Sequence, residues 1–116
     1  MHILLVEDHD DTRLVLSKLL FRCGHDVSDA ANVRDALLLL DHFLFDVLVS
    51  DIGLPDGNGL DLVAEAKRRQ GFRITVALTA LASAADHERG HQAGFDHYLT
   101  KPFDFGKLRS LLHQAA

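Results

Sequence analysis

The sequence predicts an α/β fold in which a doubly wound, five-stranded parallel sheet carries helices on both faces. Three observations lead to this prediction. Short apolar runs of strand length alternate with segments of helical periodicity along the whole chain. Several of these runs are apolar throughout, which is typical of strands covered on both faces. The 116 residues suffice for one good core and not for two, so we expect one domain spanning residues 1–116.

The first predicted strand is HILLV (2–6), and a helix follows within residues 11–24. Gly24 is the expected stop signal of that helix. The segment DVSDA (26–30) reads as a weaker strand and is a candidate for a sheet edge. The apolar face of the helix within residues 11–24 is predicted to consist of Leu16, Leu19, Leu20 and Cys23.

The second helix is expected to begin at Asn32, because Asp35 follows three residues later. The third strand is DVLVS (46–50), and a third helix ends near Gly71. The apolar stripe of the second helix is predicted at Val33, Ala36, Leu37, Leu40 and Leu44, and that of the third at Leu62, Val63 and Ala66.

The fourth strand is ITVALT (74–79), and a helix over 84–93 follows, which Ser83 can cap. The inner face of this helix offers chiefly alanines and Gly90, so we expect it to be the most weakly held of the helices. DHYLT (96–100) is the fifth strand. The last helix is expected to begin after Asp104, with Phe105, Leu108, Leu111 and Leu112 facing inward.

Five consecutive βα units favour parallel strands joined by right-handed crossovers. Five strands in a chain of this length indicate a flavodoxin-like sheet with strand order 2-1-3-4-5. The prediction is therefore a (βα)5 architecture.

Composition limits the classes of function. A hydrophobic fraction of 47% and a charged fraction of 25% are those of an ordinary globular protein. The net charge of -5 argues against direct binding of nucleic acid. No apolar segment approaches the roughly 20 residues that a membrane span requires, and the N-terminal stretch turns acidic too early for a signal peptide. We therefore expect a cytoplasmic protein without membrane insertion.

Reactive side chains follow the predicted strands where these strands end. Glu7 and Asp8 follow the first strand, and Asp51 ends the third. Thr79 ends the fourth strand, and Lys101 follows the fifth. Parallel strands end at one edge of the sheet, where ligands bind near the switch in strand order. Because strands one and three are neighbours in the predicted order, we expect the three carboxylates to converge there.

Oxygen ligands of this kind suit Mg²⁺, which accepts a few carboxylates and retains waters. Glu7 and Asp8 are therefore predicted to hold the ion, with Asp51 sharing it. A carboxylate that faces a phosphoryl donor can act as a nucleophile and form an aspartyl phosphate. Lys101 would neutralise charge on the transferred group, and Thr79 would hydrogen-bond one of its oxygens. The tendency of solvated loops to carry acidic residues would explain any one of these residues. It explains poorly why all five occur in this order at the strand ends.

In these segments the chain resembles the receiver domain of two-component response regulators, over essentially its full length. The matching pieces are LLVEDHDD, LVSDIGLPDGNGL, ALTA and HYLTKPF. The resemblance implies that Asp51 takes a phosphoryl group from the phosphohistidine of a histidine kinase or phosphotransfer protein. It implies Mg²⁺ as cofactor, with Mn²⁺ as an alternative, and Asp8 as a direct ligand. It also implies that the Gly53 carbonyl completes the metal shell and that the bond between Lys101 and Pro102 is cis.

By the same resemblance, Thr79 and Tyr98 form a switch. Thr79 would move toward the phosphoryl group and the ring of Tyr98 would swing inward, which changes the surface of helix 84–93, strand 96–100 and the last helix. That surface could also form a homodimer. The alternative for Tyr98 is a ring that simply packs near the sheet edge. The kinase, the effector or in-chain output domain, and a free-standing or hybrid-kinase origin stay open.

Three positions depart from the family pattern. Glu7 stands where aspartate is commoner, a tolerated change that would alter the metal geometry slightly. Gly53 and Leu81 lack the polar side chains that can assist hydrolysis from these positions, so the lifetime of the phosphoryl group stays open. The chain would phosphorylate and dephosphorylate itself rather than turn over a small-molecule substrate.

Two other classes of function are alternatives. A phosphatase of the haloacid-dehalogenase type also uses an aspartyl phosphate, and Asp8-His9-Asp10 has its D-x-D pattern. Such an enzyme normally carries a cap insertion, and Asp51 would have no role in it. A degenerate receiver that only binds partner proteins would not need the complete set of five residues.

Overall fold

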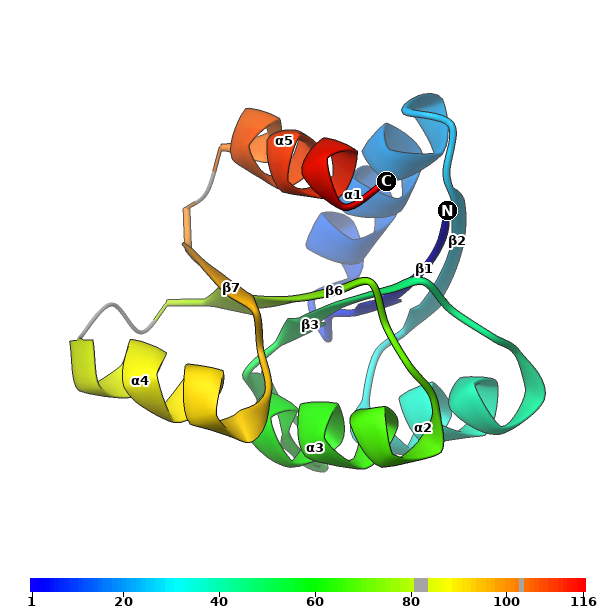
Figure 1. Cartoon of the computed structure of the whole chain (residues 1–116). Coiled ribbons are helices and arrows are strands. Elements are labelled where there is room, and N and C mark those ends of the chain that lie inside the picture. The colour runs from blue at the N-terminus through cyan, green and yellow to red at the C-terminus, as the bar shows by residue number, and fades with distance from the viewer. Residues whose placement is uncertain (81–83, 103) are drawn as a thin grey trace.

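The computed structural model describes residues 1–80, 84–102 and 104–116, and its main sheet has five parallel strands (Figure 1). The strand order is β2-β1-β3-β6-β7. Because β6 and β7 are the fourth and fifth strands expected from the sequence, the flavodoxin-like order 2-1-3-4-5 is confirmed. The strands are β1 (His2–Val6), β2 (Asp26–Ala30), β3 (Val47–Asp51), β6 (Ile74–Thr79) and β7 (His97–Thr100).

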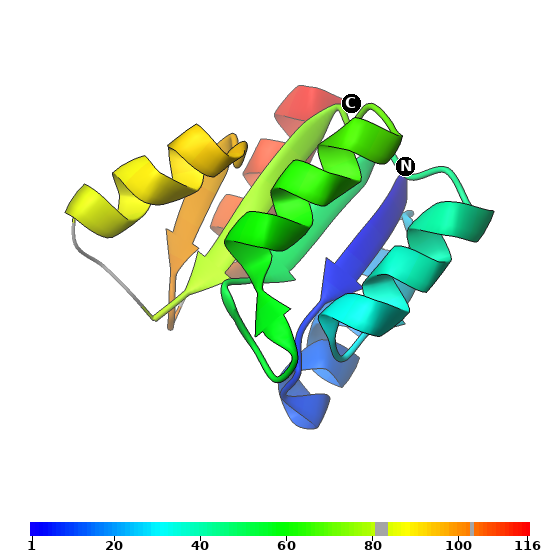
Figure 2. The same cartoon turned by 90° about the horizontal axis from the view of Figure 1, so that it is seen from below.

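Helices cover both faces of this sheet. In Figure 1, α1 and α5 lie on one face, and α2, α3 and α4 lie on the other. Figure 2 shows the second set side by side across the sheet. The helices are α1 (Asp10–Arg22), α2 (Val33–His42), α3 (Gly59–Arg69), α4 (Ala84–Ala93) and α5 (Phe105–Ala115).

The core consists of two clusters, one on each side of the sheet. Alternate residues of β1 enter different clusters: Ile3 and Leu5 face α1 and α5, while Leu4 faces α2 and α3. Such alternation follows from the two-residue period of a strand. The first cluster buries Leu16, Leu20, Leu108 and Leu112 from the helices, and the second buries Ala36, Leu40, Leu62, Val63 and Ala66.

Several helix ends follow the expected capping chemistry. The Asn32 side chain accepts a hydrogen bond from the Asp35 amide, and the Asp104 side chain accepts one from the Gly106 amide. Gly24 has a φ of 92°, a left-handed conformation that glycine adopts without strain just after a helix. The proposed cap at Ser83 lies outside the described residues.

Two residues expected in the core are exposed. Leu44 is 80% exposed, because α2 ends at His42 and the backbone of Phe43 is extended. The apolar stripe of the helix therefore stops one turn early, and Phe45 is buried instead. Cys23 is also exposed, since it lies beyond the last residue of α1.

A short antiparallel hairpin was not predicted from the sequence. It consists of β4 (Gly53–Leu54) and β5 (Gly57–Asn58) and links β3 to α3. The Asp56 carboxylate, in the turn of this hairpin, accepts hydrogen bonds from the amides of Val33 and Arg34 at 2.8 and 3.0 Å. These donors lower the pKa of Asp56. The hairpin is thus attached to the N-terminus of α2, where backbone N–H groups favour a negative charge.

Within the described parts of the chain, no helix is long and apolar enough to cross a bilayer.

Replacing Asp56 with Asn should lower the melting temperature, because a neutral amide is a weaker acceptor at the start of α2. The folded-state pKa of Asp56 lies below its ordinary value of 3.8. The stabilisation is therefore complete above pH 3.8 and is lost as the pH falls through the folded-state value. The difference in melting temperature between the wild type and Asp56→Asn should accordingly shrink in acid. Asp26→Asn, at an exposed carboxylate of β2, is the control, and an equal effect of both changes would contradict the assignment.

Candidate functional site

Four charged side chains meet at the carboxyl edge of the sheet. Glu7, Asp8 and Asp51 bring one carboxylate oxygen each within 4.8 Å of one another. The Lys101 Nζ atom lies 2.9 Å from Glu7 Oε1 and 2.9 Å from Asp51 Oδ2. The cluster forms because β1 and β3 pair directly in parallel, with Val6 opposite Ser50. Residues that follow these partners therefore emerge side by side.

The electrostatics of the cluster are those of an acidic site with too little positive charge. Glu7 is 1% exposed. Burial, and then the neighbouring Asp51, raise the pKa of Glu7 to about 7. Burial alone would lower the pKa of Lys101, but its hydrogen bonds to Asp51 and Glu7 outweigh this and raise it. One ammonium group cannot neutralise three carboxylates, so a further cation would relieve the remaining repulsion.

The donor atoms of the cluster fit Mg²⁺. Glu7, Asp8 and Asp51 supply only oxygen, and Mg²⁺ prefers oxygen ligands together with water. Asp8 is exposed and Asp51 is half-buried, so one side of the cluster is open to water. These three residues would hold the ion. Gly53 is exposed in β4, directly after Asp51 and Ile52, and the role of its carbonyl stays a prediction.

Thr79 and Pro102, two other predicted residues, are connected to this cluster through the backbone of Lys101. Thr79 ends β6, is 2% exposed, and pairs in register with Thr100 of β7. Its carbonyl accepts a hydrogen bond from the Lys101 amide at 2.6 Å. The peptide bond between Lys101 and Pro102 is cis. Thr79 and the lysine are therefore linked through the backbone at the ends of neighbouring strands.

Tyr98 lies on the side of the sheet that α2, α3 and α4 cover. It is half-buried in β7, in register with Ala77, and packs against the core on the side of α2, α3 and α4. Its ring meets that of Phe95 edge to face, with centroids 6.4 Å apart. Leu81, the other position considered for hydrolysis, lies outside the described residues.

Arg13 supports the acidic loop and was missed by the sequence reasoning. Its Nη1 atom donates to the Glu7 carbonyl at 2.9 Å, and its Nη2 atom lies 2.7 Å from Asp10 Oδ1. The residue therefore ties α1 to the loop that carries Glu7 and Asp8. The three-residue spacing of Asp10 and Arg13 on a helix predicts their ion pair, but no sequence signal predicts the bond to the carbonyl.

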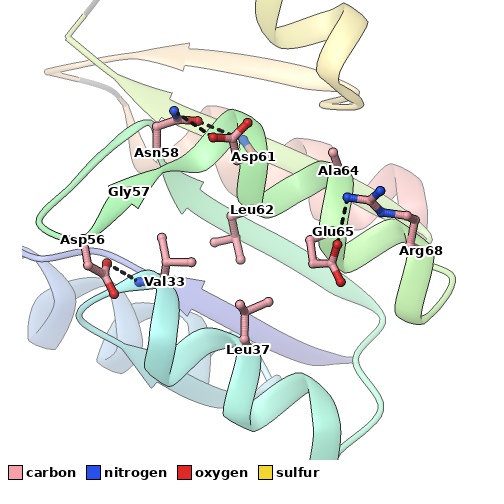
Figure 3. A pocket seen from close by; sticks show the side chains of 10 residues that line it. All are labelled: Val33, Leu37, Asp56, Gly57, Asn58, Asp61, Leu62, Ala64, Glu65 and Arg68. Atoms are coloured by element: carbon pink, nitrogen blue, oxygen red, sulfur yellow. Dashed lines mark hydrogen bonds and ion pairs between the residues drawn. The ribbon is translucent and has the colours of Figure 1, made fainter.

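A separate pocket of about 370 Å³ lies between α2 and α3 (Figure 3). Val33, Leu37 and Leu62 contribute apolar side chains to its lining. Figure 3 shows the carboxylates at this pocket paired with neighbours, Asp61 with Asn58 and Glu65 with Arg68. The four charged residues of the cluster are not among its lining residues. The pocket is thus distinct from the acidic site.

The sequence of this chain is similar to those of known proteins. A sequence model described as the response regulator receiver domain matches residues 3–113. The chain is 38% identical over 112 residues to the response regulator protein PilR of Pseudomonas aeruginosa, a match that covers 97% of this chain and 25% of PilR. It is 38% identical over 116 residues to an uncharacterized 14.6 kDa protein of Leptolyngbya boryana, covering 98% of this chain and 88% of that protein.

Solved structures show the same similarity. The chemotaxis response regulator CheY4 of Vibrio cholerae matches with a TM-score of 0.89 and 28% sequence identity, over 99% of this chain and 98% of CheY4. Several curated relatives are much longer than the matched region. The chain spans 25% of PilR and 46% of the transcriptional regulatory protein TcrA of Mycobacterium tuberculosis.

Replacing Asp8 with Asn should weaken Mg²⁺ binding by at least about tenfold, because even residues that only support metal ligands change affinity by 10–100-fold. Titration calorimetry of the purified chain with MgCl₂ measures this affinity. Asp11→Asn is the matched control, since Asp11 is an exposed carboxylate three residues further along. Equal affinities of the two variants would show that Asp8 does not contact the ion.

Proposed function

The chain belongs to the response regulator receiver domain family of two-component systems, and on this basis we propose that it accepts a phosphoryl group on Asp51 in an Mg²⁺-dependent reaction. The phosphoryl donor is the phosphohistidine of a histidine kinase or of a phosphotransfer protein. One observation carries the proposal: Glu7, Asp8 and Asp51 converge on one point, with the Lys101 ammonium bonded to two of them. Residues 1–116 would act together as one receiver domain.

In the proposed reaction a carboxylate oxygen of Asp51 attacks the phosphorus atom. The new O–P bond forms as the P–N bond to the donor histidine breaks, and the bonding electrons leave with the imidazole, which takes up a proton. The Lys101 ammonium lies 2.9 Å from Asp51 Oδ2, so it can offset the negative charge that the carboxylate and the phosphoryl group bring together. Mg²⁺ bound to the acidic residues would neutralise charge on the phosphoryl oxygens.

Lys101 and Thr79 would stabilise the phosphoryl group from the protein side. The Lys101 ammonium already lies within hydrogen-bond distance of the reacting carboxylate, so it can also reach an oxygen transferred to Asp51. The Thr79 hydroxyl would donate to another of these oxygens. We assign Asp51, Thr79 and Lys101 as the catalytic set, and Glu7, Asp8, Asp51 and the Gly53 carbonyl as metal ligands.

The signal would then leave the site through Thr79 and Tyr98. Both residues are in β6 and β7, the two strands that neighbour α4 and α5 in the chain. A rearrangement there would change the surface formed by α4, β7 and α5. That surface is the proposed contact for a downstream effector, for an in-chain output domain or for a second copy of the chain.

Replacing Asp51 with Asn should abolish phosphorylation, because the amide is not a nucleophile comparable to the carboxylate. The chain is incubated with Mg²⁺ and acetyl phosphate, and the product is examined for an acid-stable, alkali-labile adduct. Asp26→Asn is the control and should label like the wild type. An unchanged adduct in Asp51→Asn would place the phosphoryl group elsewhere. No adduct from any donor would favour a protein-binding module, and rapid turnover of unrelated phosphomonoesters would favour a phosphatase.

Replacing Gly53 with Asn should shorten the lifetime of the phosphorylated form. A side chain here has room, because a Cβ at Gly53 would meet nothing within 4 Å. An amide beside Asp51 could orient an attacking water. A side chain that transfers a proton contributes roughly 10²–10⁴-fold, and an amide that only orients the water should contribute at most about the lower end of that range. The decay of the adduct after removal of the donor measures the effect.

Gly71→Asn is the control for this change, since a Cβ at Gly71 also meets nothing within 4 Å and Gly71 lies outside the charged cluster. An unaltered decay rate in Gly53→Asn would show that this position does not govern hydrolysis.

A further inference from the structure

Gly90 of α4 faces the ring of Tyr98 on the adjacent strand β7. A Cβ built at Gly90 would overlap the Cε2, Cζ and Oη atoms of Tyr98. Gly90 itself is buried. The tyrosine ring therefore fills the volume that the side chain of any other residue would occupy at this point of the helix, since protein interiors are closely packed.

The same glycine contacts a second aromatic residue through its backbone. The Gly90 carbonyl accepts hydrogen bonds from the Phe95 amide at 3.0 Å and from the Gly94 amide at 3.2 Å. Phe95 is 1% exposed, and its ring meets that of Tyr98 at an interplanar angle of 74°. Gly90, Phe95 and Tyr98 thus form one packed unit that joins the C-terminal end of α4 to β7.

The sequence of α4 explains why this helix needs aromatic contacts from outside itself. The helix reads AADHERGHQA and contains no large apolar residue. Its sequence offers no large apolar side chain for the core, whereas Phe95 and Tyr98 on the segment that follows it supply two aromatic rings. Glycine is also less favourable than alanine inside a helix. Its presence at position 90 is therefore unfavourable for α4 alone and favourable for the contact with Tyr98.

We propose that Gly90 is a positioning residue that seats the Tyr98 ring against the backbone of α4, so that the ring and the helix change position together. The inference deepens the proposed function, on which it rests for the response to phosphorylation. The seating of the ring in the unmodified chain is independent of that function and can be tested separately.

The first measurement uses the intrinsic fluorescence of the unphosphorylated chain. Tyr98 is the single tyrosine, and the chain has no tryptophan, so tyrosine emission reports this ring alone. In Gly90→Ala the quenching constant for acrylamide should rise roughly twofold, because the ring is displaced from its closely packed position. Gly71→Ala, where a Cβ meets nothing within 4 Å, should quench like the wild type. If Gly90→Ala is more thermostable and its quenching is unchanged, the glycine has no seating role.

A second variant tests the same contact if Gly90→Ala does not fold. Tyr98→Ala removes the ring, and the amides of α4 should then exchange hydrogen about tenfold faster relative to those of α3, because the helix loses the ring that faces Gly90. Unchanged exchange in α4 would overturn the proposal.

The final measurement adds Mg²⁺ and acetyl phosphate to the wild type and to Gly90→Ala, and records the adduct and the quenching together. Both proteins should form the adduct at Asp51, but the change in quenching should be reduced at least about twofold in the variant, whose ring has already left α4. Equal changes in quenching in the two phosphorylated proteins would overturn the proposal. Absence of the adduct from both would overturn the proposed function instead, and the seating would then be judged by the first measurement.

Discussion

The ammonium group of Lys101 is the interaction on which the charged site depends. From the position that follows β7, it bonds to Glu7 at the end of β1 and to Asp51 at the end of β3. A single cation therefore connects residues that follow or end three different strands. Without it, burial and the repulsion from Asp51 would favour protonation of Glu7 or separation of the two carboxylates. The sheet brings these charges together, and the lysine offsets the repulsion between the carboxylates.

The backbone around this site is supported by groups that take no part in its chemistry. Arg13 ties the loop after β1 to α1 through the Glu7 carbonyl. Gly59, the first residue of α3, packs so closely on the Asp51 carbonyl that a Cβ would overlap it, and its amide donates to Ile52 at 2.7 Å. Asp56 attaches the intervening hairpin to α2. The carboxylates consequently stand on segments that neighbouring helices hold in place.

The helices contribute different side chains to the core. On one side, α1 and α5 bury leucines deeply between themselves and the strands. On the other side, α2 and α3 also bury leucines, whereas the described part of α4 adds Ala93 to the core and places Gly90 against Tyr98. The contact at Gly90 places a helix with few apolar side chains next to the strand that leads into Lys101. In the proposed function, a change at the end of β7 would reach α4 through this contact.

The sequence allowed much of the fold to be predicted, and the failures have identifiable causes. The five strands and the caps at Asn32 and Asp104 follow from short-range patterns of apolar and capping residues. The strand order follows from five consecutive βα units in a chain of this length. The β4–β5 hairpin was missed because two-residue strands have no detectable periodicity. Leu44 was misplaced because the apolar spacing continues past the point where the backbone of Phe43 leaves the helix.

The sequence by itself determined the alternation of strands and helices and the residue type at each strand end, because both depend on residues adjacent in the chain. Only the tertiary structure decided that Lys101 bridges Glu7 and Asp51, that burial raises the pKa of Glu7 to about 7, and that Gly90 faces Tyr98. These features depend on distances of a few ångströms between segments up to 94 residues apart in the chain. Such distances are set by the packing of whole elements, which no local pattern encodes.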